Sequence, residues 1–323
     1  MRIIFMGTPE FAVQVLEAII QEGHEVAGVY TQPDKPRGRG KSVQYTPVKE
    51  LAMEYNVPVF QPERVRDPEV VAELKTLAPE VIVVVAFGQI LPETILNLPP
   101  LGCINVHASL LPRYRGAAPI QRVIIDGETE SGVTTMYMAK GLDTGDMIEQ
   151  KVVPIDPKET GGSYHDKLAA AGAELCLSTL QKLAEGTAPR IPQDDRKSCY
   201  AHMLNKAMGE LDFQKPAEEL ERLIRGLNPW PSAYTWLQGK SLKIYEAEVV
   251  KSGADSHRMN DMPGTVIGVD KNSFTVQCNP GALRIDSLQL EGKKRMNTAA
   301  FLLGYKLSAG MRLGSRLENI RDN

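Results

Sequence analysis

The sequence predicts an α/β protein with a Rossmann-like, doubly wound and mostly parallel sheet, followed by a smaller OB-like antiparallel β-barrel. Three observations support this prediction. Strand and helix patterns alternate from the first residues onward. All five residues of the run Val81–Val85 are β-branched, which is typical of a central parallel strand that is covered on both faces. After Gly186 the alternation stops, and short strands separated by glycine-containing turns indicate a small barrel.

The amino-terminal part supplies the elements of the parallel sheet in order. Apolar runs predict strands over Arg2–Met6, Glu25–Thr31, Pro58–Phe60, Val81–Val85, Gly102–His107 and Gly132–Met138. Helical periodicity predicts helices over Pro9–Gln21, Lys49–Tyr55, Pro68–Leu77 and within Gly162–Glu185. Ligands of doubly wound sheets bind beyond the carboxyl ends of the strands, so we expect the functional site there.

The carboxyl-terminal part has a different pattern. Residues 186–208 combine Pro189, Pro192 and a run of charges with little periodicity, which is typical of a linker. We therefore divide the chain into an α/β domain at 1–189, a linker at 190–208 and a barrel at 209–323. A helix is expected around Pro216–Gly226, and barrel strands are expected over 232–237, 240–250, 263–269, 272–277 and 282–290.

Composition limits the classes of protein that remain. A net charge of −3 argues against a surface that is basic throughout but allows a local basic patch. The four cysteines are scattered and form no CxxC pair, so we expect reduced thiols and no metal site. The first residues read as a strand, and no apolar run reaches the ~18 residues of a membrane span. We expect a cytoplasmic monomer with no membrane contact.

A candidate site arises from Asn105, His107 and Asp143. Asn105 and His107 are two residues apart in a predicted strand, so their side chains leave the same face. Asp143 lies in the glycine-rich turn after the next strand, and we expect all three at carboxyl ends of strands. An amide, an imidazole and a carboxylate suit acyl transfer, although no serine or cysteine nucleophile accompanies them. The alternatives are a core histidine and an ordinary Asx-turn, but polar groups buried in an apolar strand need partners.

Two basic segments stand out beside this set. The loop at 32–47 carries Lys35, Arg37, Arg39 and Lys41, which fits either a solvated surface loop or an arm that binds phosphate. In Arg113-Tyr114-Arg115, two cations flank an aromatic ring and could guide an anionic substrate or serve as packing cover. A nicotinamide site is excluded because Gly7 stands alone and Pro9 blocks the GxGxxG turn.

The motifs resemble those of folate-dependent formyltransferases. The resemblance rests on Asn105-x-His107-x-Ser109-Leu-Leu-Pro112 and on Gly141-Leu-Asp143-Thr-Gly-Asp146. The opening segment at 4–12, the loop at 31–41 and Asn228-Pro-Trp-Pro231 make the chain similar to the bacterial members that act on methionyl-tRNA. The resemblance covers essentially the whole chain. Met203 and Phe213 depart from the family pattern and put a phosphate contact of the linker at Met203 in doubt.

The resemblance implies transfer of a formyl group from 10-formyltetrahydrofolate to the α-amine of methionine on initiator tRNA, without a metal. It assigns catalysis to Asn105, His107 and Asp143. It implies folate contacts by Ser109, Leu110, Leu111, Pro112, Phe87, Ile90 and Leu91, with a pterin pocket beside the turn at 138–143. It implies tRNA contacts by Lys35, Arg37, Arg39, Lys41 and Lys206, and by the barrel.

The residues alone leave two alternative functions open. A folate-dependent formyltransferase for a small amine needs neither the basic loop nor the second domain. A non-catalytic RNA-binding protein leaves Asn105, His107 and Asp143 without a role.

Overall fold

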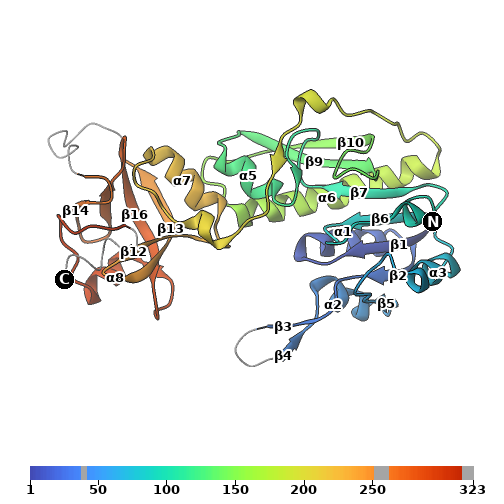
Figure 1. Cartoon of the computed structure of the whole chain (residues 1–323), viewed down its shortest axis with the longest axis horizontal. Coiled ribbons are helices and arrows are strands. Elements are labelled where there is room, and N and C mark those ends of the chain that lie inside the picture. Colours follow the sequence, from blue (N-terminus) through green and yellow to red (C-terminus); the bar gives the residue numbers. More distant parts are fainter. Residues whose placement is uncertain (38–41, 251–261, 315–323) are drawn as a thin grey trace. The chain divides into compact units, whose positions relative to one another are not determined.

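The computed structural model describes residues 1–37, 42–250 and 262–314, so Arg39 and Lys41 lie outside the described residues. The chain forms two compact units (Figure 1). The first unit comprises Met1–Pro119, Glu130–Pro154 and His165–His202. The second unit comprises Ile120–Thr129, Ile155–Tyr164 and Met203–Asn323. Residues 190–202, which were predicted to begin a linker, thus belong to the first unit.

The first unit contains a seven-stranded sheet with the order β10-β9-β7-β6-β1-β2-β5. Five strands run parallel, β9 is antiparallel to β7, and β10 is antiparallel to β9. The predicted mostly parallel sheet is confirmed. Its strands are β1 (Arg2–Gly7), β2 (Glu25–Tyr30), β5 (Val59–Phe60), β6 (Val81–Val85), β7 (Cys103–His107), β9 (Glu130–Tyr137) and β10 (Met147–Pro154).

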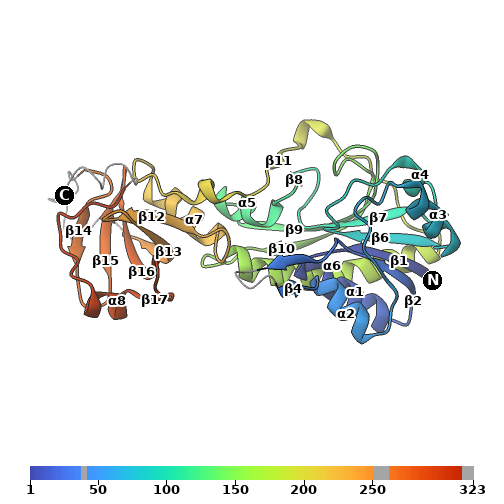
Figure 2. The same ribbon diagram turned by 60° about the horizontal axis from the view of Figure 1, so that its bottom comes forward.

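Helices cover both faces of this sheet (Figure 2). On one face, Ile4 and Ile82 pack against Leu74 and Ile95, which come from α3 and α4. On the other face, Gly172 of α6 lies against Val106 and Val133. The side chains of successive strand residues alternate between these two layers. The helices are α1 (Glu10–Gln21), α2 (Pro47–Glu54), α3 (Pro68–Thr76), α4 (Glu93–Leu96) and α6 (Gly161–Ala184).

Short elements complete the first unit. Strands β3 (Lys35–Arg37) and β4 (Ser42–Gln44) form an antiparallel pair before α2, and they project from the sheet in Figure 1. Thr46 caps α2 by accepting a hydrogen bond from the Lys49 amide, and Pro47 occupies the first turn, where no amide donor is needed. Strand β8 (Arg115–Gly116) pairs in parallel with β11 (Tyr200–Ala201). Helix α5 (Pro119–Ile125) follows, and all of it after Pro119 belongs to the second unit.

The second unit is built on an antiparallel sheet with the order β12-β13-β16-β15-β14. Gly314 bridges Trp236 of β12, and Arg312 bridges Thr265 just before β14, so the segment at 312–314 joins the two edges. Helix α7 (Ala217–Gly226) packs Leu220 into the core of this sheet. The remaining elements are β12 (Ala233–Leu237), β13 (Lys240–Val249), β14 (Val266–Val269), β15 (Phe274–Gln277), β16 (Ala282–Leu290), β17 (Met296–Asn297) and α8 (Thr298–Gly304).

Helices long and apolar enough to cross a membrane are absent from the described part of the chain.

Candidate active site

Strand β7 and the loop that follows β9 bring Asn105, His107 and Asp143 together. Asn105 and His107 share one face of β7, as predicted from their spacing. Asp143 lies beside His107 at the carboxyl end of β7, but the chain does not reach this place directly: β9 runs antiparallel to β7, and its last residue, Tyr137, pairs with Ile104 near the start of β7. The loop at 138–146 therefore folds back along β7 to bring Asp143 to Asn105 and His107.

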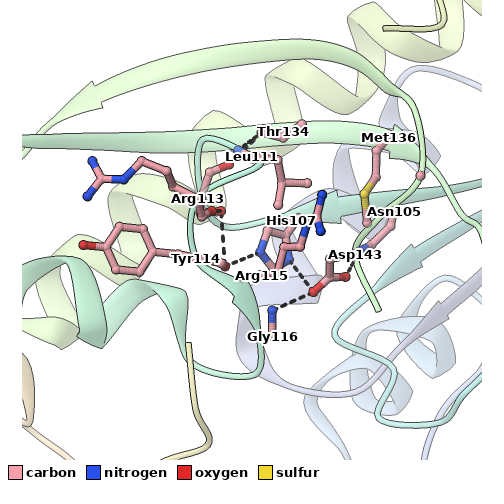
Figure 3. A network of polar contacts seen from close by, with 12 residues as sticks. Asn105, His107, Leu111, Arg113, Tyr114, Arg115, Gly116, Thr134, Met136 and Asp143 are labelled. Atoms are coloured by element: carbon pink, nitrogen blue, oxygen red, sulfur yellow. Dashed lines mark hydrogen bonds and ion pairs between the residues drawn. The ribbon is translucent and has the colours of Figure 1, made fainter. Parts of the chain in front are cut away.

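The Asp143 carboxylate is the centre of a polar network (Figure 3). Asp143 Oδ2 accepts a hydrogen bond from the Gly116 amide at 2.8 Å and lies 3.7 Å from His107 Nδ1. Asp143 Oδ1 lies 3.5 Å from Asn105 Nδ2, at the outer limit of a hydrogen bond. The side chains of His107 and Asp143 are only 8% and 12% exposed. The three predicted side chains thus converge in a site largely shielded from water.

The tautomer of His107 follows from its hydrogen bond. Nε2 lies 2.9 Å from the carbonyl oxygen of Tyr114. Because a carbonyl only accepts, Nε2 must carry the proton, and the neutral ring then has its lone pair on Nδ1. Nδ1 faces the Asp143 carboxylate. The ring is therefore oriented by the main chain at Tyr114 and can take up a second proton at the position nearest Asp143.

The turn after β7 holds the Tyr114 carbonyl in place. Ser109 Oγ donates to the Arg113 carbonyl at 2.7 Å, and Thr134 Oγ1 donates to the Ser109 carbonyl. Tyr114 itself has a left-handed backbone with φ of +57°. A non-glycine residue in this region is strained, and such strain concentrates at functional sites. The hydroxyl of Ser109, predicted to contact folate, is thus engaged within the turn.

A pocket lies beside Asp143, and it includes two of the predicted folate residues, Ile90 and Leu91. Ile90 is 85% exposed and Leu142 is 56% exposed, so apolar side chains surround its mouth. Phe87 is buried in the core cluster that also contains Leu91, and the segment Ser109–Pro112 forms the turn described above. Lining residues of the pocket are Gln89, Ile90, Leu91, Met136, Met138, Ala139, Lys140, Gly141, Leu142 and Asp143.

The residues predicted to bind tRNA are spread over both units. Lys35 and Arg37 belong to β3 in the first unit, where Lys35 is exposed. Lys206 begins a short 3-10 helix in the second unit and is also exposed. Arg115, considered as a guide for an anionic substrate, is instead bound to Gln193 and Asp195 and is 11% exposed.

Two further observations concern the chemistry of the site. Burial raises the pKa of the Cys103 thiol to about 12, so this neighbour of Asn105 stays protonated near neutral pH and offers no thiolate. Within residues 1–37, 42–250 and 262–314, His, Cys, Asp and Glu form no group of three suited to a metal ion.

One residue in contact with this site was missed from the sequence. Gln193 donates to the main-chain carbonyls of Asp143 and Gly145, both at 2.8 Å. It lies in the aperiodic stretch that was predicted to be a linker, and no local pattern distinguishes it. Only the tertiary structure brings it to the turn.

A Rossmann-like sheet that brings an amide, an imidazole and a carboxylate together beside a pocket is typical of an enzyme of acyl transfer. Comparison with known proteins identifies the family. Residues 1–180 match the family model described as formyl transferase, and residues 203–306 match the formyl transferase C-terminal domain. The chain therefore belongs to the formyl transferase family, which confirms the family resemblance of the motifs.

Full-length relatives carry a more specific name. The chain is 55% identical to the methionyl-tRNA formyltransferase of Lachnospira eligens, over 97% of this chain and 100% of the relative. It is 51% identical to the methionyl-tRNA formyltransferase of Geotalea daltonii, over 98% and 99%.

Solved structures share the fold at low sequence identity. An N-formyltransferase from Helicobacter canadensis, in complex with folinic acid and dTDP-3-aminofucose, superposes with a TM-score of 0.65. It is 19% identical and is covered over 99% of its length, with 91% of this chain. HypX from Aquifex aeolicus in complex with tetrahydrofolic acid gives a TM-score of 0.62 at 16% identity, with 96% of this chain and 50% of HypX covered.

Proposed function

We propose that this protein transfers the formyl group of 10-formyltetrahydrofolate to the α-amino group of methionine on initiator tRNA. The observation that carries the proposal is the convergence of Asn105, His107 and Asp143 beside a pocket with an apolar rim. Identity above 50% over the full length of methionyl-tRNA formyltransferases supports this choice of substrate.

The reaction needs no covalent enzyme intermediate, because the nucleophile arrives with the substrate. An α-amino group has a reference pKa of about 7.7–8.0, so a useful fraction is neutral near pH 7. The amine nitrogen bonds to the formyl carbon and gives a tetrahedral intermediate. The bond from that carbon to N10 of the folate then breaks, and the proton lost by the amine goes to N10.

Three side chains have distinct tasks in this scheme. Asn105 Nδ2, which lies 3.5 Å from Asp143 Oδ1, donates to the oxygen of the tetrahedral intermediate. Removal of such a donor typically costs on the order of 10²–10³ in rate. His107, when protonated on Nδ1, places its charge beside the same oxygen. Asp143 moves the proton from the amine toward N10, directly or through a water molecule.

The pocket beside Asp143 suits the flat ring of a folate. Exposed Ile90 and Leu142 provide apolar surface at its rim, which a heteroaromatic ring would cover. The exposed Lys140 supplies a cation at the same place, whereas the Gln89 amide is engaged by the main chain at Val65 and Pro62. We propose that Ile90 and Leu91 contact the ring. We also propose that the segment Ser109–Pro112 contacts the folate from the side of β7, while Ser109 holds the turn that presents the Tyr114 carbonyl to His107.

Binding of tRNA would involve charges from both units. We propose that Lys35, Arg37, Arg39 and Lys41 of the basic loop at 32–47 contact phosphates, together with Lys206 and the carboxyl-terminal barrel at 209–323. The α/β domain at 1–189 would then hold the chemistry, and 190–208 would connect the two domains. The proposed substrate places the reaction in the cytoplasm. We expect a monomer, for which light scattering should give 35.5 kDa.

The test is an assay with purified acceptors and labelled 10-formyltetrahydrofolate. We expect formylation of methionyl initiator tRNA, and far slower reaction with elongator methionyl-tRNA and free methionine. A dTDP-amino sugar and glycinamide ribonucleotide serve as small-amine controls. Preferential formylation of a small amine would overturn the proposal in favour of another formyltransferase. Tight tRNA binding without any transfer would instead indicate a non-catalytic RNA-binding protein.

A further inference from the structure

The side chain of Gln193 ties the loop that carries Asp143 to the segment at 190–201. Nε2 donates to the carbonyl oxygens of both Asp143 and Gly145 at 2.8 Å. These two carbonyls belong to the turn between β9 and β10. A single side chain thus holds the main chain on both sides of Thr144.

The other end of the same amide is held equally firmly. Oε1 accepts from Arg115 Nε at 3.0 Å and from Arg115 Nη2 at 2.7 Å. The two carbonyls can only accept and the guanidinium can only donate. The amide of Gln193 must therefore point Nε2 toward the turn and Oε1 toward Arg115. Both donor hydrogens and both acceptor positions of Gln193 are engaged. Arg115 Nη2 also pairs with Asp195 Oδ1 at 2.8 Å.

The segment that carries Gln193 is anchored on either side. Before it, Ile191 and Met147 exchange two main-chain hydrogen bonds of 2.9 and 3.0 Å. After it, the Arg115 amide donates to Cys199, and β11 pairs with β8. Gln193 is therefore presented from a segment whose position is determined independently of the turn.

The turn needs such support because its own backbone is strained. Asp143 has a left-handed φ of +52°, a backbone conformation that residues with a side chain adopt infrequently. Gly145 lies so close to Tyr137 that an added Cβ would be 1.7 Å from the Tyr137 carbonyl oxygen. A strained conformation persists only where its surroundings over-determine it.

The same network also reaches the Asp143 carboxylate. Gly116, which donates to Asp143 Oδ2, is the residue next to Arg115. Arg115 therefore links the side chain of Gln193 to the amide that holds the carboxylate. We propose that Gln193 is a positioning residue for formyl transfer: with Arg115 it holds the Asp143 turn in the geometry that presents the carboxylate to His107 and Asn105.

The inference rests on the proposed function of Asp143, and it predicts a specific kinetic signature. Loss of a residue that orients a reacting group typically lowers activity about 10- to 100-fold. We expect Gln193→Ala to lower kcat by this factor while KM for methionyl-tRNA changes little. Gln193→Glu should lower kcat further, because its carboxylate would be repelled by the carbonyl oxygens of Asp143 and Gly145. Gln193→Asn, which keeps the amide, should recover part of kcat.

The experiment compares these three variants in the full-length enzyme with Asp143→Ala and with Gln181→Ala. Gln181 is a control on α6, where its amide bonds only to the exposed Glu185. Steady-state kinetics gives kcat and KM for each substrate, and thermal unfolding shows whether each variant folds. Crystal structures of wild-type protein and Gln193→Ala report the position of the turn without relying on activity. We expect the Asp143 carboxylate to leave the Gly116 amide in the variant.

Each result has a definite meaning. Unchanged kcat in folded Gln193→Ala, while Asp143→Ala is inactive, overturns the inference and leaves the proposed function intact. Loss of stability with normal kcat per folded molecule overturns it as well, because the role is then structural. If wild-type protein formylates no methionyl-tRNA, the proposed function fails, and the crystal structures still decide whether Gln193 holds the turn.

Discussion

His107 illustrates how a backbone carbonyl determines the chemistry of a side chain. The Tyr114 carbonyl requires a proton on Nε2, so any further protonation occurs on Nδ1 beside Asp143. The charge of an imidazolium would then lie beside the Asp143 carboxylate. This arrangement suits stabilisation of negative charge that develops during the reaction, rather than permanent binding of a substrate.

Removal of the His107 ring should therefore affect the rate and spare tRNA binding. We expect His107→Ala to lower kcat by about 10²–10⁴, since acid–base assistance and charge stabilisation are both lost. The dissociation constant for methionyl-tRNA should remain close to the wild-type value in a filter-binding assay. His24→Ala is a matched control, because His24 lies at the start of β2 and contacts the amino terminus. A kcat for His107→Ala equal to that of the control would exclude His107 from catalysis.

At the residue scale, the spacing of the motif predicted that Asn105, His107 and Asp143 lie together, but it did not predict the contacts that hold them there. Asn105 and His107 share a face because strand residues two apart always do. The left-handed backbone of Tyr114 and the tautomer of His107 could not be predicted, since they depend on contacts across the turn. The burial of Phe87 in the core cluster that contains Leu91 could not be predicted either, and its contact with folate stays a prediction.

At the scale of elements, Glu149 shows how β10 is attached to α6. Its carboxylate accepts hydrogen bonds from Lys182, Thr179 and Ser178 at 2.6, 2.8 and 3.0 Å. Burial alone would raise the pKa of Glu149, but these hydrogen bonds hold it below the ordinary value. A lowered pKa means that the folded state prefers the charged carboxylate.

The contribution of Glu149 to stability should accordingly depend on pH. It is present above the ordinary carboxyl pKa of 4.5 and is lost as the pH falls through the lowered value of the folded state. We expect Glu149→Gln to reduce the free energy of unfolding at pH 7 by about 1–3 kcal/mol. Urea titrations at pH 7 and in the acid range should show the difference from wild type shrinking on acidification. The exposed Glu185→Gln provides the control, and a difference that is constant with pH would contradict this role.

Most elements of the sheet could be predicted from periodicity, but strand polarity could not. Val81–Val85 is a strand with every residue buried, as its composition predicts. Whether β9 runs parallel or antiparallel to β7 depends on the path of the chain between them, and the strand itself carries no such signal. Strand β10 was not predicted, because this edge strand alternates exposed and partly buried residues and carries charges.

For the molecule as a whole, binding of tRNA should have a measurable electrostatic component. Each phosphate contact contributes a slope of about −0.9 for a duplex when log K is plotted against log salt concentration. We expect Lys35→Ala and Arg39→Ala each to weaken tRNA binding and to reduce this slope by about one contact. Lys75→Ala serves as a control, because Lys75 is an exposed cation on α3. An unchanged slope for both variants would indicate that the loop at 32–47 is an ordinary surface loop.

The compact units could be predicted only in outline. The change of pattern after Gly186 predicted a second domain, but Ile120–Thr129 and Ile155–Tyr164 also belong to the second unit. Contacts between distant residues explain this, since Arg222 Nε donates to the Ile125 carbonyl and Arg225 Nη1 donates to the Glu159 carbonyl. Periodicity describes neighbours along the chain and carries no information about such pairs.

The most direct measurement of the central claim is the single-turnover rate of formyl transfer by Asp143→Asn. The amide keeps the size of the side chain and an oxygen that can accept from the Gly116 amide, so the variant removes mainly the charge and the proton-accepting group. With saturating 10-formyltetrahydrofolate and methionyl initiator tRNA, we expect the rate to fall by about 10²–10⁴ while both substrates still bind. A single-turnover rate equal to that of the wild-type protein would contradict the role of Asp143.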